Sequence, residues 1–256
     1  MTCSIDNLTL LSSLRDKRQF HAHMTSTGNE YVKSYKSNPD VYPYRDSWLM
    51  TDGSFLQYAD DTASNVPEIR FEFNPNKCNI AELLVLNSFF EDRRPSRVDI
   101  AIDFNQDLSR FLWICPGMKS KRHYSRSGQL ETLYFGVTSS ERYYRIYDKA
   151  VEQKIKDRTW WRVEAQSRYG PKDKDNLPAD LFNGLYAISP LQADIQDRAM
   201  VRYLRDFPEN MPDLKRKNKA RLLRLCAESA EILNVNDLYS KSRGDLRKGL
   251  NLWVEQ

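Results

Sequence analysis

A predicted β-strand over residues 142–149 places tyrosines among cations, an arrangement suited to nucleophilic chemistry. Because side chains alternate along a strand, Tyr143, Arg145, Tyr147 and Lys149 share one face. A cation beside a phenol favours the nucleophilic phenolate, and Arg145 and Lys149 could also neutralise a phosphate. We therefore interpret this face as a candidate site for attack on a phosphodiester, with Tyr147 or Tyr143 as the nucleophile. The alternative, a half-buried structural aromatic, is the commoner fate of a tyrosine.

Carboxylates on two other predicted strands are candidate metal ligands. Asp99 and Asp103 lie on the polar side of an alternating segment at residues 98–103, and Glu164 lies on another at residues 161–166. If these strands are neighbours, the carboxylates converge, and Mg²⁺ is usually held by one or two carboxylates together with substrate phosphate. Asp99 and Glu164 are the best pair for Mg²⁺ or Mn²⁺. The alternative is a polar side whose acids pair with arginines, namely Arg70, Arg97 and Arg162.

Basic residues are concentrated in two segments without any acid, although the net charge is only +4. The first segment lies between Asp107 and Glu131, and the second lies between Asp213 and Glu228. Such segments suit a polyanion, because each Lys or Arg near a phosphate releases a condensed counterion. A solvated helix face is the alternative for either segment alone, but two such segments favour nucleic acid. In the second segment, the residues expected to bind DNA are Lys215, Arg216, Lys217, Asn218, Lys219 and Arg221.

Composition limits the class of protein and its setting. The chain has 256 residues, of which 40% are hydrophobic and 12% aromatic, enough for one large domain or two small ones. No run approaches the roughly 18 apolar residues of a membrane span, and the N-terminus lacks the order of a signal peptide. The four cysteines form no CxxC pair, so we expect a cytoplasmic protein without a disulfide framework or a zinc site. No P-loop is present, so ATP hydrolysis would need another protein.

The elements that must position these residues predict an α+β fold. We expect a mostly antiparallel sheet of about five strands over residues 66–168, with helices packed on it. We divide the chain into an N-terminal α/β extension (1–65), a catalytic core (66–170) and a helical region with the DNA-recognition segment (171–256). Outside the sheet the pattern predicts a strand at 5–10 and helices at 11–24, 108–114, 181–185, 193–207 and 219–235.

Four segments carry a family resemblance, and they read IRFEFNPNK (69–77), SRVDIAIDF (96–104), ETLYFGVTSSERYYRIYDKAVEQK (131–154) and WWRVEA (160–165). With these motifs in this order, the chain resembles the replication initiators of small staphylococcal-type rolling-circle plasmids, the Rep_trans family. The resemblance implies that the nucleophile of the family's RIY motif falls on Tyr147. It likewise places the family's metal-site acids on Asp99 and Glu164. Asp103 and Lys149 also match family positions, and we assign them to the metal site and to catalysis.

The resemblance further implies an activity and partners. Members bind the double-strand plasmid origin and nick one strand through a covalent 5′-phosphotyrosine, with metal-assisted transesterification and later rejoining. This is a topoisomerase-like nicking and closing reaction in the bacterial cytoplasm. The expected partners are origin DNA with a single-stranded hairpin nick site, a second copy in a homodimer, and a host superfamily-1 helicase of the PcrA type, with no membrane.

The implied architecture is an HUH-like nicking fold without a true HUH motif. The His21-Ala22-His23 triplet superficially matches a metal motif but lies in a predicted helix or loop. Two alternatives to a replication initiator are a relaxase of a conjugative or mobilisable element, which shares the tyrosine chemistry, and a non-catalytic origin-binding protein. An ordinary carboxylate nuclease would cleave without covalent attachment.

Overall fold

The structure is a computed structural model that describes residues 1–26, 31–34, 44, 46–60, 66–168, 177–190 and 194–254. Within these residues, ten strands form one antiparallel sheet in the order β2-β3-β4-β5-β1-β6-β11-β10-β9-β8. The strands are β1 (Thr2–Leu14), β2 (Tyr31–Ser34), β3 (Asp46–Met50), β4 (Phe55–Tyr58), β5 (Ile69–Phe73), β6 (Phe90–Phe104), β8 (Ser120–Tyr124), β9 (Leu130–Phe135), β10 (Arg142–Asp148) and β11 (Trp161–Arg168).

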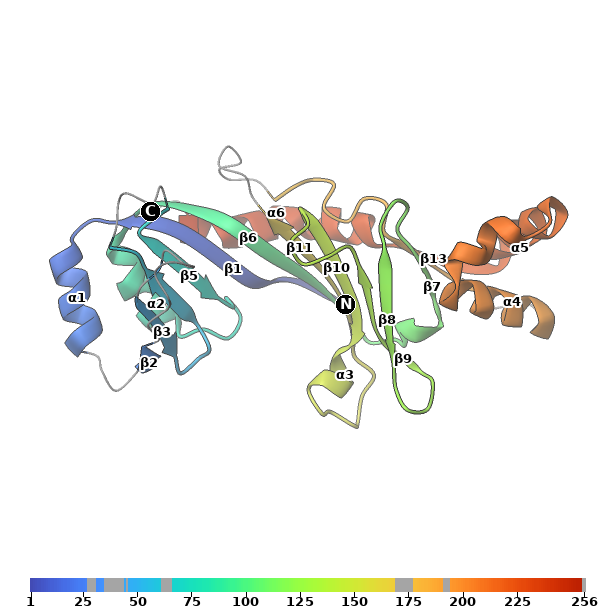
Figure 1. Ribbon diagram of the computed structural model, residues 1–256, viewed down its shortest axis with the longest axis horizontal. Coiled ribbons are helices and arrows are strands. Elements are labelled where there is room, and N and C mark those ends of the chain that lie inside the picture. Colours follow the sequence, from blue (N-terminus) through green and yellow to red (C-terminus); the bar gives the residue numbers. More distant parts are fainter. Residues whose placement is uncertain are drawn as a thin grey trace.

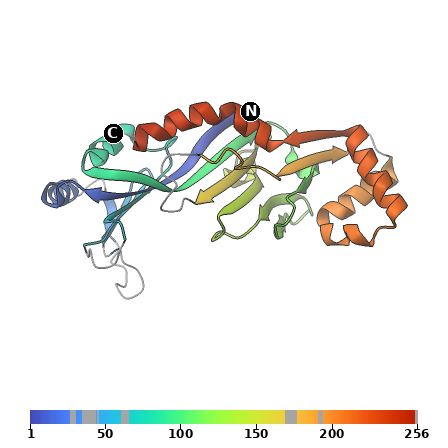
Figure 2. The ribbon, with the colours of Figure 1, turned by 90° about the horizontal axis from the view of Figure 1, so that it is seen from above.

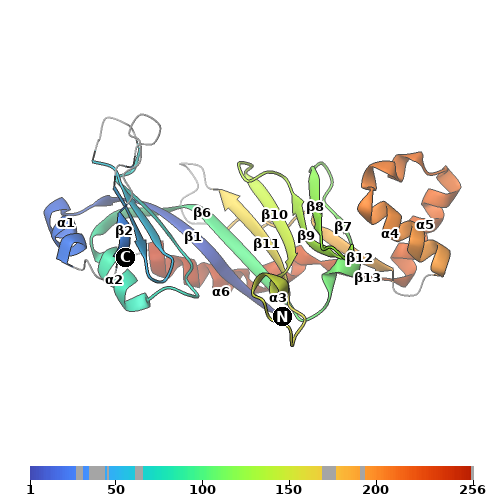
Figure 3. The same ribbon diagram turned by 60° about the horizontal axis from the view of Figure 1, so that its bottom comes forward.

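The centre of the sheet is the pairing of β1 with β6, which runs along most of both strands. Figure 3 shows these two strands crossing between the β2–β5 group and the β8–β11 group. The expected strand at 5–10 is therefore longer, and the expected helix at 11–24 is wrong over residues 11–16. The strand continues because Leu10, Ser12 and Leu14 alternate into the core, and α1 (Lys17–Ser26) begins only after Asp16.

One face of the sheet is covered by α6 (Val235–Val254), which lies along β1 and β6 (Figures 1 and 2). Its buried side chains recur at helical spacing, and the ring of Trp253 packs edge-on against Phe73 with centroids 5.0 Å apart. Tyr144 of β10 also points to this side, where its hydroxyl donates a hydrogen bond to the Leu181 carbonyl at 2.8 Å. With this face buried, the alternate residues of each strand are left for the opposite face.

A second, three-stranded sheet lies at one end of the molecule (Figure 1) and consists of β7 (Leu112–Ile114), β12 (Tyr186–Pro190) and β13 (Ala230–Asn234). It carries α4 (Ile195–Asp206) and α5 (Arg216–Ser229), joined by the 3₁₀ segment η3 (Pro208–Asp213). This helical lobe has its own small apolar core, made by Leu112, Val201, Leu204 and Leu222. The remaining helices are α2 (Ile80–Ser88) and the single turn α3 (Lys149–Glu152).

The second sheet corrects three helix predictions. Residues 108–114 form one 3₁₀ turn, η2 (Leu108–Arg110), followed by β7. Residues 181–185 are turns rather than a helix, and the expected helix at 219–235 changes into β13 after Ser229. Each of these apolar runs is short, and periodicity alone cannot separate a short buried strand from a helix. Residues 112–114 and 230–234 are strands because both segments pair with β12, which is distant from them in sequence.

The α+β class with a large antiparallel sheet and packed helices is confirmed, but the number of strands was underestimated. Six strands of the sheet lie in residues 66–168, where about five were expected, and β1 to β4 come from the segment assigned to an extension. Because β1 lies between β5 and β6, the sheet continues across the proposed boundary at residue 65. The domain boundaries themselves stay predictions. No helix in the described ranges is long and apolar enough to cross a bilayer.

The packing of α6 predicts a large loss of stability when its buried face is truncated. Leu250→Ala removes a side chain with no solvent exposure, and we expect the free energy of unfolding to fall by about 2–4 kcal/mol. The matched control is Leu252→Ala on the same helix, where the side chain is 65% exposed and the expected change is within about 0.5 kcal/mol. Urea unfolding measures both variants, and equal losses would contradict this packing.

Candidate active site

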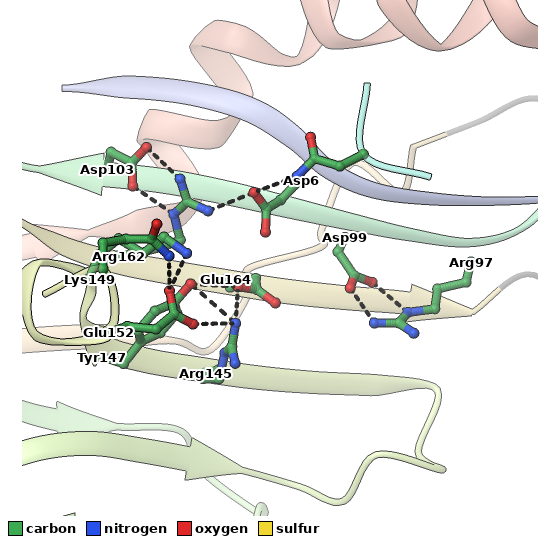
Figure 4. A network of polar contacts seen from close by, with 12 residues as sticks. Asp6, Arg97, Asp99, Asp103, Arg145, Tyr147, Lys149, Glu152, Arg162 and Glu164 are labelled. Carbon is green, nitrogen blue, oxygen red and sulfur yellow. Dashed lines mark hydrogen bonds and ion pairs between the residues drawn. The ribbon is translucent and has the colours of Figure 1, made fainter. Parts of the chain in front are cut away.

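The face of the sheet opposite α6 carries the candidate catalytic residues in cross-strand rows. Tyr147 of β10 pairs with Arg162 of β11, and Arg162 pairs with Asp103 of β6. Two residues along the strands, Arg145 of β10 pairs with Glu164 of β11. The sequence prediction that these residues share one face is therefore met, because β10, β11 and β6 are consecutive in the sheet. Figure 4 shows their side chains gathered over these strands.

Tyr147, Glu164 and Arg145 make a closed triangle of hydrogen bonds. The phenol of Tyr147 donates to Oε2 of Glu164 at 3.2 Å. Nη2 of Arg145 donates both to that oxygen at 2.8 Å and to the phenol oxygen at 3.1 Å. A carboxylate therefore lies where it can accept the phenol proton, and a guanidinium lies against both oxygens. This is the arrangement expected of an activated nucleophile.

Burial sets the protonation state of Tyr147. The residue is only 3% exposed, with the Arg145 guanidinium 4.1 Å and the Lys149 ammonium 5.4 Å from its ring centre. Desolvation, followed by the charge of Glu164, raises the pKa of Tyr147 well above its usual value, against the opposing effect of Arg145 and Arg162. The cations favour phenolate, as the sequence argument expected, but burial and the charge of Glu164 outweigh them in this state of the site. Tyr147 is a neutral phenol that needs a base.

Lys149, the predicted catalytic lysine, begins α3 directly after Tyr147's strand. Its side chain is buried and forms an ion pair with the carboxylate of Glu152. Glu152 also lies 3.9 Å from Arg145, so α3 places a carboxylate beside the two cations nearest Tyr147. The lysine is therefore next to the candidate nucleophile, with its charge balanced by Glu152.

Asp103 forms an ion pair with Arg162 and does not contact the other two predicted metal ligands. The guanidinium donates to both oxygens of Asp103, at 2.7 and 2.9 Å, and its third donor reaches Asp6 of β1 at 2.6 Å. Trp160 adds a hydrogen bond from its indole nitrogen to Asp103 at 2.9 Å. Asp6 was absent from the predicted site, because its place depends on β1 lying beside β6.

Asp99 forms a separate ion pair, apart from the Tyr147 triangle in Figure 4. The residue is 2% exposed, and its carboxylate accepts two hydrogen bonds from Arg97, which lies 3.6 Å from Glu72. Burial raises the pKa of Asp99 to about 6, against the opposing effect of Arg97.

The three predicted ligands share a face, but they do not form a closed metal site. Among the described residues there is no group of three or more His, Cys, Asp or Glu side chains that could hold a metal ion. The alternative of acid–arginine pairing is realised, in the pairs Asp99–Arg97, Asp103–Arg162 and Glu72–Arg70. Glu164 lies opposite Ala101, between Asp99 and Asp103, and is thus a diagonal neighbour of both. This donor set fits Mg²⁺ only with one or two carboxylates and substrate oxygens completing the shell.

The predicted DNA-binding residues gather at the start of α5, whose first turn contains no acid. Lys215, Arg216, Lys217 and Asn218 are exposed and Lys219 is half-buried. Arg221 differs, because its guanidinium contacts both oxygens of Asp197 at 2.7 Å, and Asp197 is 2% exposed. Arg221 therefore fastens α5 to α4, while the preceding residues remain open to a ligand.

The sequence analysis expected Arg145 to neutralise a phosphate and Arg162 to pair with an acid, but it did not identify the partners of either residue. Arg145 bridges the phenol and Glu164, and Arg162 bridges Asp6 and Asp103. The signal for both was present, since each alternates with a predicted catalytic residue on its own strand. What the alternation could not supply was the strand order that brings them together.

Comparison with known proteins found no matching family model. Two replication initiation proteins of Staphylococcus aureus are 34% and 32% identical over 206 residues, which cover 73% of this chain. The chain spans 64% of the length of these curated relatives. A solved rolling circle replication initiator protein from Geobacillus stearothermophilus is 18% identical, with a TM-score of 0.44 over 65% of this chain and 74% of that one.

The burial of Asp99 predicts a pH dependence of stability. Its pKa is about 6 in the folded state against 3.8 ordinarily, so the folded state binds the extra proton between these values. The free energy of unfolding should therefore fall as pH rises from about 4 to 6, by up to about 3 kcal/mol. Asp99→Asn should flatten this part of the profile in urea unfolding at stepped pH. The control is Asp245→Asn, at a side chain 87% exposed, which should leave the pH dependence of the free energy of unfolding unchanged. If Asp99→Asn also left it unchanged, a group other than Asp99 would be responsible for the pH dependence.

Proposed function

Because this chain is homologous to the replication initiation proteins of Staphylococcus aureus, we propose that it initiates rolling-circle replication of a plasmid. In this proposal it binds the double-strand origin and nicks one strand through a covalent 5′-phosphotyrosine. The observation that supports it most is the Tyr147 phenol hydrogen-bonded to Glu164, with Arg145 against both. The buried hydroxyls of Tyr144 and Tyr239 are each satisfied by a backbone carbonyl, whereas that of Tyr147 meets a carboxylate and a guanidinium.

The nicking step is a transesterification. The oxygen of Tyr147 attacks the scissile phosphorus while its proton passes to Glu164. The bond from phosphorus to the 3′ oxygen breaks, and that oxygen takes a proton from water to become a free 3′ hydroxyl. Arg145 and Lys149 neutralise the phosphate oxygens as charge develops on them. Because the phosphotyrosine bond replaces one phosphodiester by another, a 3′ hydroxyl can later reverse the step and rejoin the strand.

Substrate entry must uncover Tyr147, which is only 3% exposed. Arg145 is paired with Glu164, and Lys149 is paired with Glu152. A DNA phosphate competes with these carboxylates for the same two cations. Movement of Arg145 and α3 toward the phosphate then exposes the Tyr147 side chain. It also places both cations at the reacting phosphate.

We assign metal binding to Asp99 and Glu164, with Asp103 as a further ligand, for Mg²⁺ or Mn²⁺. When bound, the metal polarises the scissile phosphate as a Lewis acid. To serve as ligands, Asp99 must leave Arg97 and Glu164 must leave Arg145, and Glu164 would bind the metal through Oε1, since Oε2 is the oxygen that accepts the Tyr147 proton. The arginines released in this way are then free to hold phosphate oxygens.

The exposed cations at the start of α5 are assigned to the origin duplex, where phosphate contacts position the protein and a few side chains read bases. A homodimer, a hairpin nick site, a host superfamily-1 helicase and a cytoplasmic setting complete the proposal. A relaxase of a mobilisable element would use the same chemistry on a transfer origin. A non-catalytic origin-binding protein would form no adduct.

The test of the proposal is a covalent adduct on labelled origin DNA. Wild-type protein with Mg²⁺ or Mn²⁺ should leave protein on the 5′ end of the nicked strand, seen as a shifted band in denaturing gels. Tyr147→Phe should abolish this adduct, because phenylalanine has no oxygen that could bond to the phosphorus. Chelation with EDTA should remove nicking reversibly.

The matched control is Tyr143→Phe, which deletes the other phenol on the same face of β10. It should retain adduct formation within about threefold. An adduct that persists in Tyr147→Phe and disappears in Tyr143→Phe would move the nucleophile to Tyr143. No adduct with the wild-type protein would leave the non-catalytic alternative.

The start of α5 predicts a salt-dependent contribution to origin binding. Replacing Lys215, Arg216 and Lys217 together with Ala should weaken binding and lower the slope of log K against log salt by about 2 to 3, because each phosphate contact contributes about 0.9. The control replaces three exposed cations of α6 with Ala, namely Lys241, Arg247 and Lys248. Fluorescence anisotropy at several salt concentrations compares the two, and equal slopes would assign α5 to a solvated face.

A further inference from the structure

Three aromatic side chains form a row across the face that carries Tyr147. His123 of β8 meets Tyr134 of β9 edge-on, with ring centroids 5.6 Å apart. Tyr134 stacks on Tyr143 of β10, with centroids 5.8 Å apart and planes 18° from parallel. His123 is exposed, and both tyrosines are half-buried, so each ring keeps an edge or face open to solvent. The proposed reaction uses none of the three.

The register of the strands joins this row to the nucleophile. His123 pairs with Thr132, and Thr132 pairs with Tyr147, so one short side chain separates the histidine from the phenol. Tyr134 pairs with Arg145 on one side and with Lys121 on the other. Cross-strand partners lie roughly 5 Å apart, so the rings begin directly beside the reacting group.

The charge around the row fits a nucleic acid strand. Strand β8 and the turn that leads to β9 lie in the acid-free segment between Asp107 and Glu131, where Lys119, Lys121 and Arg126 are exposed. Strand β8 is at the edge of the sheet. A flat row of rings flanked by cations suits unpaired bases, because each base offers a face for stacking, whereas a duplex hides these faces.

The hairpin of β8 and β9 also borders the helical lobe. A cavity of about 430 Å³ lies between them, and it is lined by Ser120, Arg122, Tyr124, Phe207 and Glu209. These β8 residues alternate with Lys121 and His123, so they line the opposite side of the strand. The lobe whose α5 is assigned to the duplex therefore meets β8 on the side opposite the row of rings.

We propose that His123, Tyr134 and Tyr143 form a stacking platform for unpaired bases of the DNA strand that flanks the scissile phosphate. Lys121 then contacts the sugar-phosphate backbone of that strand. The platform rests on the proposed role of Tyr147. It orients the strand by its bases without reading their identity, since stacking tolerates every base. It thus adds single-strand affinity to the duplex affinity of α5.

The test is binding of a fluorescein-labelled ten-nucleotide oligothymidylate to the full chain in EDTA, where metal-assisted cleavage is prevented. The double variant His123→Ala/Tyr134→Leu should bind at least about tenfold more weakly, because stacking on one aromatic ring commonly supplies a fivefold or greater effect. Tyr134→Phe keeps the ring and should bind within about twofold of wild type. Affinity for the duplex origin should not change in either variant.

The control is Tyr124→Leu, an exposed aromatic on the same strand that faces the cavity instead. Weaker single-strand binding in the double variant alone supports the platform. Equal loss in Tyr124→Leu, or no loss in the double variant, overturns it. Photocrosslinking of an iodouracil-substituted oligonucleotide, mapped by mass spectrometry, provides a second test that needs no substitution. Crosslinks at Tyr134 or His123 support the platform, and crosslinks confined to α5 overturn it.

These outcomes are separable from those of the nicking proposal. Unchanged single-strand binding in the double variant, with an intact wild-type adduct, would overturn only the stacking role. Absence of a wild-type adduct would overturn the nicking role, whereas the binding series would still decide whether unpaired DNA lies on these rings.

Discussion

The antiparallel pairing of β1 with β6 is the interaction on which the rest of the sheet depends. β1 lies between β5 and β6, and β11 pairs with the other edge of β6. The pairing also places Asp6 of β1 near Arg162, and Asp99 opposite Asn7. Because side chains alternate, a slip of one residue would turn these carboxylates into the core under α6. The pairing of β1 with β6 contains shifts in register. These shifts are compatible with the site only if they keep the carboxylates on the face opposite α6.

Charge on the open face is balanced by pairs that are partly withdrawn from water. Arg97, Arg145 and Arg162 each contact a carboxylate, and the carboxylates concerned are 3–17% exposed. Removing one partner of such a pair leaves a poorly hydrated charge, which is strongly destabilising. A phosphate that recruits Arg145 therefore leaves Glu164 in need of a new cation. In this way the proposed binding of DNA and of metal favour each other.

The lobe that carries the basic end of α5 is held by its own small core and by the bond from Arg221 to Asp197. It is nevertheless tied to the main sheet, because β13 leads directly into α6. The proposed duplex contacts and the proposed strand chemistry thus lie on separate surfaces of one continuous framework. The aromatic row on β8, β9 and β10 lies between these two surfaces, where a strand passing from one to the other would need support.

The sequence by itself determined the α+β class, the shared face of Tyr147, Arg145 and Lys149, and the family resemblance that the staphylococcal relatives confirm. These features are local, because a strand's period of two and a motif's residues need no partner. Only the tertiary structure decided that β1 is central, that residues 230–234 form a strand, and that arginines hold Asp99 and Asp103. It also decided that Tyr147 is a buried, neutral phenol donating to Glu164. Strand order, register and desolvation depend on residues that are far apart in the chain. They therefore cannot be predicted from the periodicity within any one segment.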